Sequence, residues 1–240
     1  MKKLIQLELK RTGLRPYVWA AAAILAGLAA MGGLLLSIPA VTASMGEALE
    51  ADDALLFSSW DHLLPVQSVL AMAAFSILAA VMGGRFVVSE YGGKQVILLF
   101  SYPVPRRAVL LAKCLLVFGF PAAAGILVNL AVCAGLGLGS NLLGIVAEPF
   151  GGDTLRTLGL LSVELGVLAG AIGLLSLTVG FGRRTTSPTI VAGVVLACAA
   201  AQMLSAVPAL GLSVTLGALA LAMASVLWLS GRVERMEAAG

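Results

Sequence analysis

The chain has 240 residues, of which 60% are hydrophobic and 11% are charged, and its formal net charge is +3. Soluble domains carry about 25% charged residues, so this composition excludes an ordinary soluble protein. Continuous apolar stretches of about 18 residues or more are typical of transmembrane helices. Six such stretches leave little sequence for a soluble domain: residues 17–38, 63–82, 108–135, 158–181, 188–207 and 209–230.

These stretches predict an all-α, polytopic membrane protein with six transmembrane helices and one transmembrane domain over residues 1–240. Backbone polar groups in lipid must bond to each other, which only helices and closed barrels achieve, and none of the stretches alternates as a barrel strand does. The first stretch follows a basic segment, as a signal core would. Its length of about 22 residues exceeds the roughly 7–15 of a signal core, so we interpret it as a retained span.

The segment before the first stretch mixes lysines with apolar residues: Leu4, Ile5, Leu7 and Leu9. One interpretation is a short N-terminal interfacial helix, which lies in the membrane surface with its lysines towards anionic headgroups. The other interpretation is a basic anchor beside the membrane that has no further role.

The positions of Lys and Arg predict the orientation, because cytoplasmic segments of membrane proteins are enriched in both residues. If the N-terminus is cytoplasmic, 14 of the 15 Lys and Arg residues fall in cytoplasmic segments, and only Arg156 falls outside. We therefore expect both termini in the cytoplasm. The positive net charge then follows from topology, and it does not indicate nucleic-acid binding.

No motif of a nucleotide-binding or hydrolytic site is present. The Gly93-Lys94 pair does not form a P-loop, since Val88 and Gln95 stand where that motif needs Gly and Ser or Thr. Neither GxSxG nor HExxH occurs. The single histidine, His62, and three cysteines without CxxC spacing do not suggest a metal site. We predict no catalytic residue, no metal and no cofactor.

Three polar residues interrupt the apolar stretches: Asn129, Glu164 and Gln202. An ionisable residue inside the membrane is by default a candidate functional group. Glu164 could accept a proton or hold a cationic substrate on a translocation path, with Asn129 and Gln202 as further path residues. It could equally serve helix packing or reach the headgroups, since it lies roughly 9 Å from the end of its stretch.

Two glycines in the fourth stretch, Gly166 and Gly170, form a GxxxG pattern. Such a pattern lets the backbones of two membrane helices approach closely. In a chain with 28 glycines it also arises by chance, so both a helix contact and a chance match remain open.

The segment between the second and third stretches has the most ordered polar pattern in the chain. A polar start, an apolar run over 96–100 and a rigid basic exit follow one another. Lys113 comes seven residues after Arg106, so the two share a helix face, and the lysine can extend to the cytoplasmic surface. An apolar run on that side needs the membrane surface, the bundle or another protein to cover it.

This order of residues resembles the loop of type-2 ATP-binding-cassette (ABC-2) permeases. The matching residues are Glu90, Gly92 or Gly93, Val96 to Leu99, Tyr102-Pro103, Arg106 or Arg107, and Lys113. The start of the chain, LIQLELKRTGLRPYVW, also resembles that family, and the basic turn Phe181-Gly182-Arg183-Arg184 is similar to its six-span bacterial members. Pro105 departs from the family, where Ser is commoner before the Arg, and leaves the register of the exit open.

The resemblance implies a permease subunit of an ATP-driven exporter in the bacterial inner (plasma) membrane. In that family a coupling helix between spans two and three docks on a separate cytoplasmic ATPase, and two permease chains work with two ATPases. The implied coupling residues are Glu90, Tyr91, Gly92, Gly93, Lys94, Val96, Leu99, Tyr102 and Pro103, with Arg106, Arg107 and Lys113 at the base of the third span.

The resemblance leaves the substrate class open: an antibiotic peptide, a small hydrophobic compound or an ion. It also leaves open whether the second permease is another copy or a homologue. Two other functions remain possible from the residues alone. The chain could be a proton-coupled secondary transporter that uses Glu164, or a scaffold or sensor subunit that transports nothing.

Overall fold

The computed structural model describes residues 13–45, 59–89, 106–144, 146, 148–183 and 185–238. These residues are almost wholly helical and contain no strand, which confirms the predicted all-α class. The elements are α2 (Arg15–Ser44), α4 (Trp60–Gly83), the π-helix η1 (Gly84–Val88), α7 (Arg106–Leu143), α8 (Gly152–Arg183), α9 (Thr186–Ala206), the 3-10 turn η2 (Pro208–Leu210) and α10 (Gly211–Ala238).

All six predicted stretches fall in helices that are long and apolar enough to cross a membrane, so the chain is a multi-pass membrane protein. Most helices are longer than the predicted stretches; α2, for example, continues from residue 38 to Ser44, and α10 from residue 230 to Ala238. α7 continues from residue 135 to Leu143, and α8 begins at Gly152 instead of residue 158. The glycine-rich end of α7 gave little helical signal, but Ser140 and Asn141 bond the backbone of Gly137 and Phe150 and stabilise this end.

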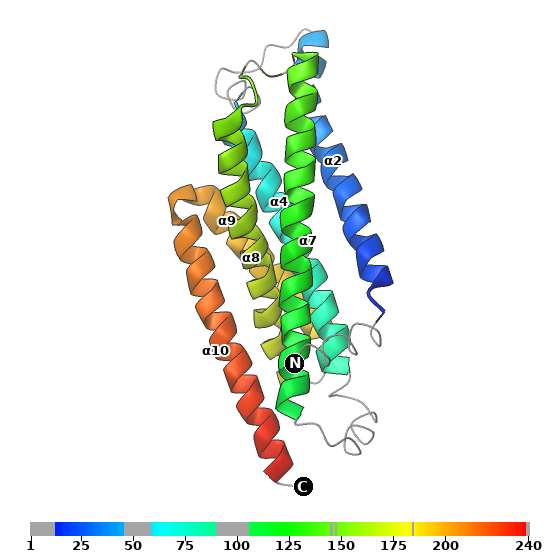
Figure 1. Ribbon diagram of the computed structural model, residues 1–240, viewed down its shortest axis with the longest axis vertical. Coiled ribbons are helices and arrows are strands. Elements are labelled where there is room, and N and C mark those ends of the chain that lie inside the picture. Colours follow the sequence, from blue (N-terminus) through cyan, green and yellow to red (C-terminus); the bar gives the residue numbers. More distant parts are fainter. Residues whose placement is uncertain are drawn as a thin grey trace.

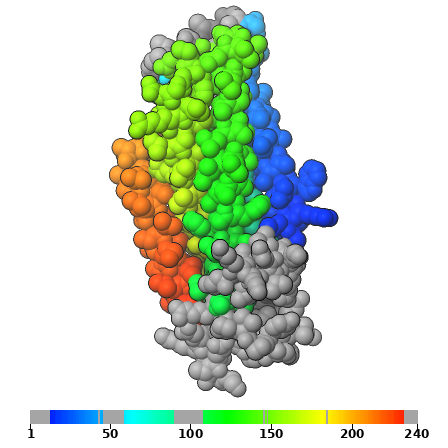
Figure 2. All heavy atoms as spheres, in the orientation of Figure 1, coloured from blue at the N-terminus to red at the C-terminus, as the bar shows by residue number. Residues whose placement is uncertain are grey.

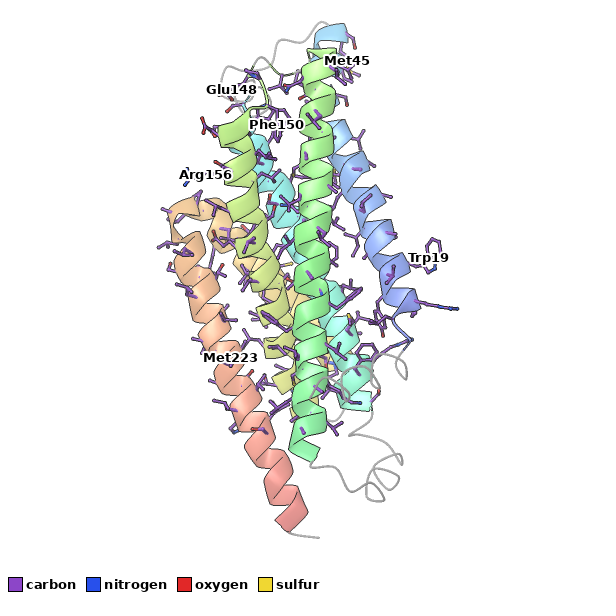
Figure 3. The ribbon with its side chains drawn as sticks, in the orientation of Figure 1. Trp19, Met45, Glu148, Phe150, Arg156 and Met223 are labelled. Atoms are coloured by element: carbon purple, nitrogen blue, oxygen red, sulfur yellow. The ribbon has the colours of Figure 1, made fainter. Side chains whose placement is uncertain are left out.

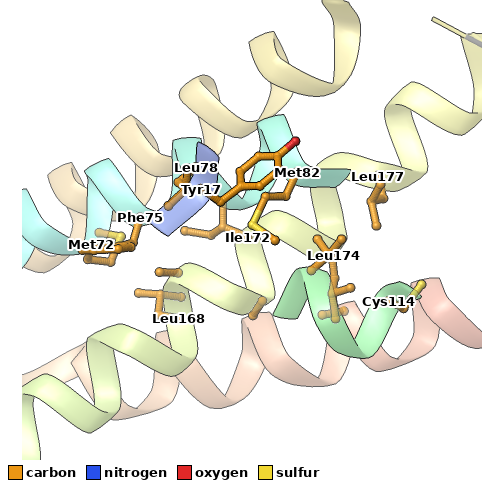
Figure 4. Close-up of a cluster of buried hydrophobic side chains, with 14 of the residues drawn as sticks. Tyr17, Met72, Phe75, Leu78, Met82, Cys114, Leu168, Ile172, Leu174 and Leu177 are labelled. Carbon is orange, nitrogen blue, oxygen red and sulfur yellow. The ribbon is translucent and has the colours of Figure 1, made fainter. Parts of the chain in front are cut away.

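The six helices run alternately up and down as one elongated bundle (Figure 1). α4 and α8 bury more than half of their apolar segments, whereas α2, α9 and α10 bury less than a quarter. The bundle is therefore built around α4 and α8, with α7 beside them and the other three helices at the periphery. Figure 4 shows the apolar core between these helices, in which Phe75 of α4 is fully buried and lies near Leu168 and Ile172 of α8.

The GxxxG glycines mark a close helix contact, as one of the two interpretations predicted. A Cβ atom at Gly166 would lie 3.0 Å from the carbonyl oxygen of Ala122, and one at Gly170 would lie 2.9 Å from the carbonyl oxygen of Phe118. Ala122 and Phe118 belong to α7. The two backbones approach this closely because the glycines have no side chain.

We call the end of the bundle that holds the start of α2 and the end of α8 the basic end, because Arg15 and Arg183 lie there. α10 also ends there, so the first described helix begins and the last one ends at this end of the bundle (Figure 1). Trp19 points away from the bundle near the start of α2, whereas Arg156 lies nearer the opposite end, level with the turn between α9 and α10 (Figure 3). We call that opposite end the far end.

One tryptophan, Trp60, holds two segments together at the far end. Nε1 of Trp60 donates a hydrogen bond of 2.9 Å to the carbonyl oxygen of Glu148, and its ring meets Phe150 edge to face with centroids 5.2 Å apart. Trp60 is the first residue of α4, while Glu148 and Phe150 precede α8. The contacts therefore join the ends of α4 and α8.

The hairpin of α9 and α10 is shorter than the rest of the bundle. Its turn, η2, stops well below the far end, which α7 and α8 reach (Figure 2). The turn lies beside the middle of α8, where Gly211, the first residue of α10, approaches Glu164. The side of the bundle formed by α9 and α10 therefore extends less far towards the far end than the side formed by α7.

Candidate functional site

The predicted coupling helix and the predicted N-terminal interfacial helix lie outside the described residues. So do most of the predicted coupling residues, which are Glu90, Tyr91, Gly92, Gly93, Lys94, Val96, Leu99, Tyr102 and Pro103. Arg106 and Arg107 are the first two residues of α7. The structure does describe the two stems that flank this segment, which are η1 before it and the start of α7 after it. The candidate site is therefore built from these stems.

Lys113 is buried, which corrects the expectation that it extends to the membrane surface. Its side chain is 1% exposed, and Nζ donates a hydrogen bond of 3.1 Å to the carbonyl oxygen of Phe86. A buried polar group needs a partner inside the protein, and a backbone carbonyl supplies one here. The lysine thus turns into the bundle and joins α7 to η1.

The segment η1 is a π-helix, a rare form that is frequent at functional sites. The backbone N–H of Ser89 bonds the carbonyl oxygen of Gly84, five residues before it, which is the π-helical spacing. The Ser89 hydroxyl also donates to the carbonyl oxygen of Arg85. α4 therefore changes its helical form in its last turn before the segment that carries the family resemblance.

Three further helices approach η1. Tyr17 of α2 meets the ring of Phe86 edge to face, with centroids 5.1 Å apart. A Cβ atom at Gly84 would lie 3.5 Å from Thr186 of α9, and one at Gly180 of α8 would lie 3.1 Å from Val88. We call η1 together with Tyr17, Lys113, Gly180 and Thr186 the η1 junction.

The η1 junction connects α2, α7, α8 and α9 at the basic end. The first turn of α2 and the first turn of α9 both reach the same five-residue segment. A displacement of η1 would therefore act on four helices at once. Sequence reasoning named Lys113 but missed Phe86 and Tyr17, because nothing in an apolar run marks which carbonyl a lysine will reach.

A second polar group lies at the centre of the bundle around Asn129. Nδ2 of Asn129 donates to Oγ of Ser68 at 2.9 Å and to Oγ of Ser162 at 2.8 Å. Oδ1 accepts from the thiol of Cys133 at 3.6 Å. We call Asn129, Ser68, Ser162 and Cys133 the Asn129 cluster. It joins α4, α7 and α8, and both amide hydrogens of Asn129 are used.

Gln67, which sequence reasoning overlooked, lies next to this cluster. Its Nε2 donates a hydrogen bond of 2.9 Å to the carbonyl oxygen of Leu28 in α2. Within the part of the chain that the structure describes, no donor bonds its Oε1. Gln67 borders a cavity of about 20 Å³ among Gly32, Trp60 and Leu136, which is too small for a transported solute.

The structure does not bring the three predicted path residues together. Asn129 is buried in its cluster, whereas Gln202 is exposed on α9. Oε1 of Glu164 would lie 2.5 Å from a Cβ atom at Gly211, so this carboxylate faces the turn between α9 and α10. Ser162 and Glu164 are two positions apart on α8 and face opposite sides of it.

The described residues contain no group of three or more His, Cys, Asp or Glu that could hold a metal ion. His62 is exposed at the start of α4.

No protein-family model matches the chain, and no solved structure matches it. The chain is similar to an uncharacterized protein of Bacillus subtilis (strain 168), YcbO. The two are 26% identical over 196 residues, which make up 80% of each chain. The similarity therefore extends over most of the six-helix bundle, and it brings no functional assignment.

Proposed function

We propose that the chain is the membrane subunit of an ATP-driven exporter of the ABC-2 type, powered by a separate cytoplasmic ATPase. The ATPase would bind the segment between η1 and α7, and the basic end would face the cytoplasm of a bacterial cell. A second permease, identical or homologous, would complete the transporter. The substrate would be an antibiotic peptide, a small hydrophobic compound or an ion.

The observation that supports this proposal most is the hydrogen bond between Lys113 and Phe86. It ties together the two stems of the segment whose Glu–Gly–aliphatic–Tyr-Pro–Arg order resembles the family. A partner that pulls on a loop moves the bundle only if the stems of that loop are held firmly. The η1 junction supplies such a connection to α2, α8 and α9.

The orientation is supported by the basic residues. Arg15, Arg85 and Arg183 belong to the segments at the basic end, and cytoplasmic segments of membrane proteins carry an excess of Lys and Arg. The tryptophans do not distinguish the two sides, since tryptophan is enriched at both membrane–water interfaces.

The geometry gives less support to a proton-coupled carrier. A proton relay needs ionisable groups that communicate across the membrane. Glu164 instead faces Gly211 at the turn of the α9–α10 hairpin, on the side of α8 opposite the Asn129 cluster. The scaffold or sensor alternative would leave the sequence pattern at 90–107 without a partner that uses it.

The test is co-purification with an ABC-type ATPase, chosen from those that the neighbouring genes encode. The two are co-expressed, extracted in mild detergent and purified through a tag on the chain. We expect the ATPase to be retained by the wild type and lost with Glu90→Ala and with Lys94→Glu. Asp61→Ala, an exposed change at the far end, is the matched control and should retain it.

Failure of the wild-type chain to retain this ATPase would overturn the proposal. The proposal would also be overturned if both loop variants retained the ATPase as well as the wild type does, since the binding surface would then lie elsewhere. Transport that continues after every associated ATPase is removed would favour the carrier instead.

A further inference from the structure

We propose that Lys113 is a positioning residue that clamps η1 to the start of α7, so that movement of one stem is passed to the other. The inference rests on the proposed function, which gives the segment between the stems a partner that moves it. The clamp is a specific bond between Nζ of Lys113 and the carbonyl oxygen of Phe86.

The first argument is the cost of placing a lysine here. Lys113 is among the largest fully buried side chains, and its neighbours one turn away on α7, Leu110 and Val117, are fully buried apolar residues. An ionisable residue inside a membrane helix is expensive and is retained mainly where it has a function. A methionine of similar length would fill the space without that cost, so packing alone does not account for the lysine.

The second argument is the place of its partner. Phe86 lies in the π-helical segment, where the backbone has left the α-helical register. A π-turn holds one more residue than an α-turn, so a return to the α-helical form would shift this segment by one residue. An amine that bonds a carbonyl of the π-turn opposes such a shift. The clamp would therefore hold η1 in its π-helical register.

The third argument is what the segment touches. The ring of Phe86 meets Tyr17 at the start of α2, and Gly84 lies against Thr186 at the start of α9. A change of register in η1 would rotate Phe86 relative to Tyr17 by about one residue, or roughly 100°. Lys113 thus controls whether a movement near α7 reaches the peripheral helices α2 and α9.

The experiment measures amide hydrogen exchange by mass spectrometry on the chain in lipid nanodiscs. In the chain alone, Lys113→Met should speed exchange in peptides that cover 84–89 by about tenfold, the size expected for the loss of one charge-assisted hydrogen bond. Exchange near Trp60 should stay unchanged. Leu110→Ala is the matched control, since it opens a buried site on the same helix without removing the bond.

The second arm uses the complex with the ATPase, with and without a non-hydrolysable ATP analogue. In the wild type, we expect the analogue to change exchange in 84–89, in 15–20 and in the start of α7 together. Lys113→Met should still bind the ATPase, because a buried side chain does not contact it. The changes in 84–89 and 15–20 should then be lost while the change in α7 remains, and Lys113→Arg should restore them.

If the ATP analogue changes amide exchange in Lys113→Met as it does in the wild type, the proposed clamp is wrong. The clamp is also wrong if Leu110→Ala loses the exchange changes in 84–89 and 15–20 to the same extent, because the effect would then come from core packing in general. If Lys113→Met does not fold, Lys113→Gln takes its place and is judged by the same outcomes. If no ATPase binds the wild type, the proposed function fails, and the clamp is decided by the first arm alone.

Discussion

The carboxylate of Glu164, in the middle of α8, lies against Gly211, the first residue of α10. A Cβ atom at Gly211 would come within 2.5 Å of Oε1, so the backbone of α10 begins directly at this carboxylate. The first turn of a helix carries unbonded N–H groups and a partial positive charge. The N–H of Gly211 itself bonds the carbonyl oxygen of Pro208 in η2. We therefore expect Glu164 to act on the start of α10 through its charge.

Glu164→Gln should lower stability modestly and leave transport intact. A carboxylate at a helix start contributes about 0.3–1 kcal/mol, and a neutral amide keeps the shape while it loses the charge. Thermal unfolding in detergent measures the change, and Gly217→Ala on α10, where an added Cβ meets nothing within 4 Å, is the control. Loss of transport at unchanged stability would instead show that the carboxylate carries protons or substrate.

The Asn129 cluster should behave as a structural connection among three helices. A double-mutant cycle of Asn129→Ala and Ser162→Ala should give a coupling energy of about 0.6–1.7 kcal/mol, the range measured for hydrogen bonds between membrane helices. Unfolding by denaturant reports each variant. A coupling energy near zero, together with a large loss of transport, would place Asn129 on the transport path.

The contact between α8 and α7 should be intolerant of side chains at the GxxxG glycines. Gly170→Ala brings a Cβ atom to 2.9 Å from a backbone carbonyl oxygen, which cannot move aside as a flexible side chain can. We expect destabilisation of about 1–3 kcal/mol, as for other overpacked sites. Gly159→Ala on the same helix meets nothing within 4 Å and should be close to neutral or stabilising in the same unfolding assay.

The orientation can be measured with single cysteines in a cysteine-free chain. Asp61→Cys, at the far end, should react with a membrane-impermeant thiol reagent added to whole cells. Gly182→Cys, an exposed position at the basic end, should react only after the membrane is opened. The reverse pattern would contradict the expected cytoplasmic position of the basic end.

The six spans could be predicted because hydropathy alone decides which segments cross lipid. Their arrangement could not, since helices that are apolar on all sides do not reveal which face meets which neighbour. The predicted path shows this limit. Asn129 and Glu164 were grouped by polarity, but Ser162, two residues before Glu164, is the one that meets Asn129.

Lys113 shows a second limit. Its position seven residues after Arg106 suggested a shared surface face, so the lysine was expected to extend to the cytoplasmic surface. The π-helical turn at 84–88 supplies the carbonyl that it bonds instead, and no residue type in GRFVV signals a π-turn. The direction of this side chain therefore depended on a backbone feature that the sequence does not display.

The low turn between α9 and α10 affects the surrounding lipid. The 21 residues of α9 make a helix of about 32 Å, close to the roughly 30 Å of a hydrocarbon core. On the other side the 38 residues of α7 extend about 57 Å, and the exposed Leu138 and Leu142 continue its apolar surface towards the far end. We expect lipid that follows both apolar surfaces to be thicker beside α7 than beside the α9–α10 hairpin. A gradient of membrane thickness would then orient the molecule in its plane.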